Sequence, residues 1–194
     1  MKKAVILPAI LLLLVIAPAT YAATATWVDY WEPDNPIYFS SNPWAGDAVR
    51  QFTYVHDLTD QNLSGAPFVV GQDTITDLDL EIGFYDDSYD PRRGQNEMAF
   101  VSLSGALFPF LSPDASEPYE ITIDEDNPWR FRVLNAINDN GMLSVTITVL
   151  MGDFYLGSST LTANGTSAVP IPASLILLGS GLVGLLKFRK VACA

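Results

Sequence analysis

Residues 75–84 read Ile-Thr-Asp-Leu-Asp-Leu-Glu-Ile-Gly-Phe, and this alternation of apolar and polar residues decides the fold class. Successive side chains of a β-strand point to opposite faces, so Leu78, Leu80, Ile82 and Phe84 share one face. Ile75 joins that apolar row only after one slip in phase. The intervening residues are mostly acidic, which is typical of a strand with one buried face and one solvent-exposed face.

Four further stretches are also rich in β-branched and aromatic residues: 49–56, 99–103, 119–124 and 154–161. Clusters of Gly, Pro, Asn and Asp separate them, and short strands with regular turn signals are typical of a sandwich or a barrel. No stretch of the domain keeps a 3.6-residue periodicity, so little helix is expected. We therefore predict an all-β domain, an antiparallel β-sandwich of jelly-roll-like type.

The clearest local prediction is a hairpin around Gly141. Asn140-Gly141 supplies the positive φ angles of a tight I′ turn. The outgoing strand would start near Trp129 with Phe131, Val133 and Ile137 on one face, and the returning strand would carry Leu143, Val145, Ile147 and Val149.

The two ends of the chain carry export signals. Lys2 and Lys3 precede an apolar run and then small residues, a pattern that predicts a signal peptide over 1–23 with cleavage after Ala22 or Ala23. At the other end, an apolar stretch and a basic cluster predict one transmembrane helix with a basic cytoplasmic end. The exported β-sandwich domain would occupy 24–168 and the tail 169–194.

The C-terminal tail begins with Val169-Pro170-Ile171-Pro172-Ala173-Ser174, and from this motif onward it resembles that of the PEP-CTERM protein-sorting family. The matching residues are followed by an apolar Leu/Gly segment and then by the basic stop of Lys187, Arg189 and Lys190. Ile171 stands where the family's name-giving Glu would be. The resemblance implies a Gram-negative bacterial protein, processed by an exosortase-type membrane peptidase and often associated with exopolysaccharide. The sorting signal itself consists of Val169, Pro170, Ile171, Pro172, Ala173 and Ser174.

The charge of the exported domain excludes several partners. All 22 acidic residues lie between Asp29 and Asp153, together with only five arginines and no lysine, hence a net charge of −17 there. Such a domain cannot neutralise phosphates, which excludes nucleic acid, and it is unsuited to an anionic lipid surface. The sole cysteine, Cys193, lies beyond the basic stop, so the domain must be held together by its core alone.

The candidates for chemistry are few. His56 is the only histidine, and no nucleophile motif accompanies it, so a surface or hydrogen-bonded structural role is expected and no catalytic residue is assigned. Asp- and Asn-rich loops offer the oxygen ligands that calcium prefers, although the same residues also form ordinary turns. The candidate calcium ligands are Asp86, Asp87, Asp90, Asp124, Asp126 and Asn127.

A cluster of aromatic residues near the N-terminus allows two interpretations: a sugar-stacking platform or, as the favoured alternative, packing into the core. Its members are Trp27, Tyr30, Trp31, Tyr38 and Trp44.

Together these features predict a non-enzymatic surface or extracellular-matrix protein that requires no cofactor. It would be exported, transiently anchored in the membrane and then released to the cell surface or matrix. The alternatives are a calcium-dependent carbohydrate-binding module and, more distantly, a secreted hydrolase.

Overall fold

The computed structural model describes residues 21–42, 44–60, 65–85, 97–111 and 118–169. Thr24–Ser167 forms one compact unit. A second unit comprises Met1–Ala23 and Ala168–Ala194, of which the described residues are the first three of one strand and the last two of another. The predicted domain boundaries after residues 23 and 168 stay a prediction. The first strand begins at Tyr21, before the first of these boundaries.

The described part of the chain is all-β with one helix, as predicted, and its paired strands form antiparallel sheets. The five predicted strand stretches all fall on strands. The elements, in order, are β1 (Tyr21–Trp31), β2 (Ile37–Ser40), β3 (Gln51–Asp57), β4 (Thr74–Tyr85), β5 (Met98–Leu103), β6 (Ala106–Leu111), β7 (Tyr119–Ile123), α2 (Arg130–Asn140), β8 (Met142–Met151) and β9 (Asp153–Val169).

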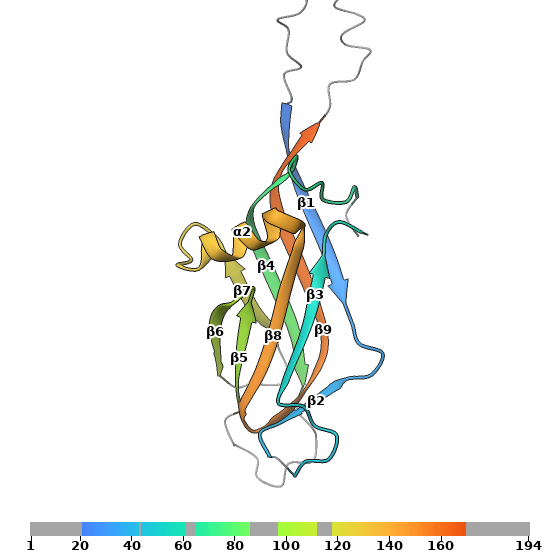
Figure 1. Ribbon diagram of the computed structural model, residues 1–194, viewed down its shortest axis with the longest axis vertical. Helices are drawn as coiled ribbons and strands as arrows, with labels where there is room; N and C mark the ends of the chain where they lie inside the picture. Colours follow the sequence, from blue (N-terminus) through green and yellow to red (C-terminus); the bar gives the residue numbers. More distant parts are fainter. Residues whose placement is uncertain (1–20, 43, 61–64, 86–96, 112–117, 170–194) are drawn as a thin grey trace, which may run out of the picture. The chain divides into compact units, whose positions relative to one another are not determined.

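Two sheets share these strands (Figure 1). Sheet A has the order β1-β9-β4-β7, with the short β2 also paired to β9, and sheet B has the order β3-β8-β5-β6. The neighbours form a nested series in which β5 pairs with β6, β4 with β7, β3 with β8 and β1 with β9. The first long strand of the chain therefore lies beside the last one.

One apolar core joins the inward faces of both sheets. Leu78, Leu80 and Ile82 of β4 are fully buried in the same cluster as Val145 and Ile147 of β8. Burial of each such side chain contributes about 1.5–3 kcal/mol relative to exposure. The predicted apolar row of β4 is thus the one that packs, and its acidic row faces outward.

The phase slip in β4 is a β-bulge. The register against β9 shifts between Ile75 and Asp77, so Thr76 is the extra residue. Gly165 of β9 lies opposite Ile75, and a side chain there would collide with the Thr74 carbonyl oxygen. The bulge therefore depends on a glycine in the partner strand, which agrees with the usual role of glycine where two backbones approach closely.

The predicted outgoing strand of the hairpin is wrong, because residues 130–140 form the helix α2. Val133, Leu134 and Ile137 are its buried residues, a helical spacing that includes Leu134 and omits Phe131, which is 78% exposed. The helix packs against β4 and β8, one strand from each sheet. Tertiary burial of this face outweighs the weak local pattern.

Gly141 does adopt a positive φ, +75°, but it ends α2 as a left-handed C-cap whose N–H donates to the Ile137 carbonyl at 2.7 Å. The predicted returning strand is confirmed as β8. A two-residue connection with positive φ at both positions, Ser104 (+46°) and Gly105 (+87°), instead joins β5 to β6.

Among the residues that the structure describes, no helix is both long and apolar enough to cross a bilayer. The predicted transmembrane helix lies in 170–194, outside the described residues, as does nearly all of the predicted signal peptide.

Candidate functional site

A row of three tyrosines crosses the outer face of sheet A. Tyr85 of β4 stacks on Tyr155 of β9, with ring centroids 5.4 Å apart and planes within 8°. Tyr38 of β2 lies on the other side, with its centroid 4.9 Å from that of Tyr155. The Tyr38 hydroxyl donates a 2.8 Å hydrogen bond to the Asp153 carboxylate. All three rings are partly exposed.

Strand alternation and two glycines position this row. Tyr85 follows Asp79, Glu81 and Gly83 on the outward side of β4. A second register shift, between Gly83 and Phe84, brings Tyr85 opposite Tyr155. The edge of the Tyr85 ring lies over Gly157, where an added Cβ would be only 3.0 Å from it. Partial burial, together with Tyr155, raises the pKa of Tyr85, so its hydroxyl stays neutral at physiological pH.

On the same outer face, separated from Tyr85 by Gly83 along β4, is a polar hollow of about 330 Å³. The strand register places Glu81 directly opposite Glu120 of β7 on one side and Thr160 of β9 on the other. In the next outward row, Asp79 of β4 lies between Thr122 of β7 and Thr162 of β9. The hollow is lined by Asp79, Leu80, Glu81, Glu120, Thr122, Thr160 and Thr162.

A second polar cluster is buried at one edge of the two sheets. His56 of β3 is linked through Nδ1 to the Asp29 carboxylate of β1 at 2.7 Å. Its Nε2 lies 3.0 Å from the Ser159 hydroxyl of β9. This Asp-His-Ser order and these distances resemble the triad of serine hydrolases.

Burial argues that this cluster is structural. His56 is 0% exposed and Ser159 is 1% exposed, so a substrate carbonyl cannot reach the serine oxygen in this conformation. The cluster instead connects β3 of sheet B to β1 and β9 of sheet A. The Ser159 hydroxyl also lies within hydrogen-bond distance, 3.2 Å, of the Glu81 carbonyl oxygen. The prediction of a hydrogen-bonded structural histidine fits this geometry.

The pKa of His56 is lowered by burial, which outweighs the opposing hydrogen bond and charge of Asp29. The neutral ring can donate a hydrogen bond from Nδ1 to the Asp29 carboxylate and accept one from the Ser159 hydroxyl at Nε2. Burial likewise raises the pKa of Tyr54, whose ring lies edge-on to the His56 ring at 5.5 Å. Both side chains are therefore uncharged near neutral pH.

The predicted calcium ligands divide into two groups. Asp86, Asp87 and Asp90 lie outside the described residues. Asp124 accepts a hydrogen bond from the Asp126 amide, and Asn127 accepts one from the Trp129 amide and donates to the Thr122 carbonyl. These side chains shape the turn that leads into α2. Within the described ranges, no three metal-ligating side chains gather into one group.

The predicted aromatic platform does not form as one surface. Trp27 is buried against Phe68, and Trp31 stacks on Tyr54 at 4.1 Å. Tyr30 and Trp44 are exposed, Trp44 by 90%. Only Tyr38 joins the tyrosine row, whose other members were not predicted from the sequence. Tyr85 and Tyr155 could have been found from the outward phase of their strands.

Of the predicted sorting signal, only Val169 is described, as the last residue of β9. The residues from Pro170 to Ser174 and the basic stop at Lys187, Arg189 and Lys190 lie outside the described residues.

Comparison with protein-family models and with curated proteins finds no match to this sequence.

Proposed function

We propose that the chain is an exported, non-enzymatic surface or extracellular-matrix protein, sorted by an exosortase-type membrane peptidase and associated with exopolysaccharide. Its exported domain is a β-sandwich of the jelly-roll type. The nested pairing of the strands supports this assignment, because wrapping one long hairpin into two four-stranded sheets produces this order of neighbours.

The observation that carries the proposal is the position of the two ends of the compact unit. Thr26, near the start of β1, donates a 2.8 Å hydrogen bond to Asn164, near the end of β9. In the sequence, the predicted export signal precedes Thr26, and the Pro170-Ile171-Pro172 sorting motif begins six residues after Asn164. The two ends of the compact unit therefore lie side by side, and the sequence continues from each of them into one of the two predicted signals.

The composition supports the same function. The domain combines its own apolar core with a net charge of −17 and no lysine, which favours a soluble, dispersed protein outside the cell. A non-enzymatic role is consistent with the burial of Ser159 and His56. A secreted hydrolase is the most distant alternative, since the pair is closed off from solvent.

Intact-mass analysis of the mature protein tests the proposal. The surface form should begin after Ala22 or Ala23 and end before Leu175. Removal of the exosortase-type peptidase should leave a form that retains the tail. A mature surface protein that still carries Lys187–Ala194 would overturn the sorting assignment.

A calcium-dependent carbohydrate-binding module is the second candidate, and the tyrosine row on the same outer face as a polar hollow is the observation that favours it. A calcium site that holds its ion at about 100 times the dissociation constant would stabilise the fold by about 2.7 kcal/mol. The protein should then melt several degrees higher in calcium than in chelator. Equal shifts with magnesium would indicate charge screening alone, because magnesium demands a tighter octahedral geometry.

A further inference from the structure

The hollow and the tyrosine row follow one another along β4 and β9 on the outer face of sheet A. The outer strip, as we call it, consists of Asp79, Glu81, Glu120, Thr122, Thr160, Thr162, Gly83, Tyr38, Tyr85 and Tyr155. Asp79 and Tyr85 are six residues apart on β4, so the strip extends for about 20 Å at roughly 3.4 Å per residue. Between them lies Gly83, which has no side chain and whose added Cβ would lie 3.2 Å from the Ser158 hydroxyl oxygen.

The strands of sheet A contribute charge of one sign. They contain six acidic residues and no lysine, arginine or histidine, although one of the six, Asp29, is paired with the buried His56. A cation from outside the sheet, Arg130 of α2, donates a hydrogen bond to the Thr76 carbonyl of β4. Glu81 and Glu120 lie directly opposite each other on neighbouring strands, and a like-charged pair in that position is unfavourable. A cationic ligand above the pair would relieve this repulsion.

We infer that the outer strip binds a polysaccharide rich in free amino groups, such as a partly de-N-acetylated glucosamine polymer. This inference rests on the proposed association with exopolysaccharide and specifies its chemistry. The carboxylates of Asp79, Glu81 and Glu120 pair with the ammonium groups, and the threonine hydroxyls bond to sugar hydroxyls. The ring faces of Tyr38 and Tyr85 that are not turned toward Tyr155 contact the apolar faces of the sugars and attract nearby ammonium groups.

The same surface disfavours other polysaccharides. A uronate-containing or otherwise anionic chain would be repelled by every charge on the sheet. A neutral chain could use the tyrosines and threonines but would leave the Glu81–Glu120 repulsion in place. Amino groups are thus the feature that the strip selects.

The test uses the full chain in a mild non-ionic detergent and two probes of equal length, a glucosamine oligomer and its fully N-acetylated counterpart. Calorimetric titration at about pH 6 keeps carboxylates ionised and amines protonated. We expect about tenfold tighter binding of the glucosamine oligomer, a preference that weakens as salt is added.

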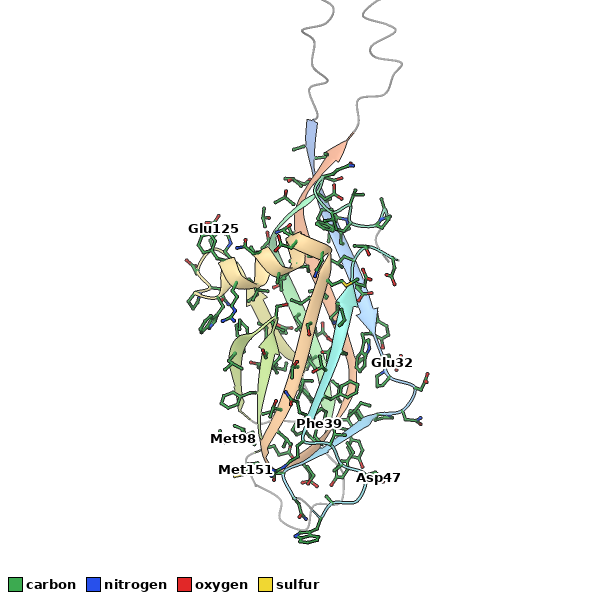
Figure 2. The ribbon with its side chains drawn as sticks, viewed as in Figure 1. Glu32, Phe39, Asp47, Met98, Glu125 and Met151 are labelled. Carbon is green, nitrogen blue, oxygen red and sulfur yellow. The ribbon has the colours of Figure 1, made fainter. Side chains whose placement is uncertain are left out.

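The matched variants differ only in where two charges are removed. In the double variant Glu81→Gln with Glu120→Gln, the affinities for the two probes should differ by no more than about twofold. Glu32→Gln with Glu125→Gln removes the same charge from exposed sites outside the strip and should keep the preference; Figure 2 shows Glu32 and Glu125 on separate loops. Tyr85→Ala should weaken the binding of both probes.

Equal affinity of the wild-type protein for both probes would overturn the inference, as would an equal loss of preference in both double variants, which would indicate diffuse net charge. Neither result touches the proposed function, because sorting and the mass of the mature form are measured separately. Conversely, a tail that is never removed would refute the sorting proposal and leave the binding result standing.

Discussion

Gly141 ends α2 with a backbone conformation that only glycine adopts without strain, and it does so in a crowded place. Its φ is +75°, and an ideal Cβ built there would collide with the Thr59 methyl group and lie 3.2 Å from the Phe68 ring. Gly141→Ala should therefore incur two separate penalties. The left-handed conformation costs roughly 1–2 kcal/mol, and forcing a methyl group into a packed site typically costs about 1–3 kcal/mol.

The chain provides a control for each penalty. Gly71 has a φ of +78° with nothing within 4 Å of its added Cβ, so Gly71→Ala should show the conformational penalty alone. Thr59→Ser in the Gly141→Ala background removes the obstructing methyl group. It also keeps the hydrogen bonds from the Thr59 amide and hydroxyl to Asp57, so it should recover most of the stability lost to the packing penalty.

Denaturant unfolding measures these differences as shifts in the free energy of unfolding. We expect a loss of about 2–5 kcal/mol for Gly141→Ala and roughly 1–2 kcal/mol for Gly71→Ala. Equal losses for the two variants, or no rescue by Thr59→Ser, would refute the packing of Thr59 against the helix end.

Three further predictions concern the core and its polar contacts. The lowered pKa of His56 means that the unfolded chain binds more protons as the pH falls through about 6.5, so stability should decrease from pH 7 towards pH 5.5; the single imidazole NMR signal gives this pKa directly, and a value above 6.5 would contradict the account. Phe154→Ala should cost about 3–5 kcal/mol in denaturant unfolding, because the ring packs at 5.0 Å on Phe39 and 5.3 Å on Phe84. Asn138→Ala should cost about 1–3 kcal/mol by the same measurement, since its amide bonds both backbone groups of Ile75 and would leave them unpaired; an unchanged midpoint would show that water replaces it.

Alternation predicted the strands because half-buried strands record their two faces directly in the sequence. In β4 even the phase slip at Thr76 corresponds to a structural feature, the bulge against Gly165. The helix α2 was missed because its buried face is only three residues long and its flanks contain turn-forming Asn and Asp. The φ of Gly141 was predicted, but a positive φ serves a helix cap as well as a turn.

The candidate site was harder to predict, because it depends on which strands become neighbours. Tyr38 and Tyr155 are far apart in the sequence and meet only through the pairing of β2 with β9. The same holds for Asp29, His56 and Ser159, which three different strands bring together. Sequence spacing does not reveal either arrangement, whereas it suggested a platform of neighbouring aromatics whose members the fold in fact separates, with Trp27 in the core and Tyr30 and Trp44 exposed.

The nesting of the strands also sets the order in which the protein can fold. The two-residue turn at Ser104-Gly105 joins β5 to β6, so that hairpin can form as soon as both strands exist. In the outermost pair of strands, the hydrogen bond between Thr26 and Asn164 closes a sequence separation of 138 residues. Closing so long a loop costs chain entropy before it gains any contact, which slows folding. A chain that is synthesised from the N-terminus must therefore keep β1 unpaired until β9, immediately ahead of the tail, has been made. The unpaired β1 is where association with other chains would begin.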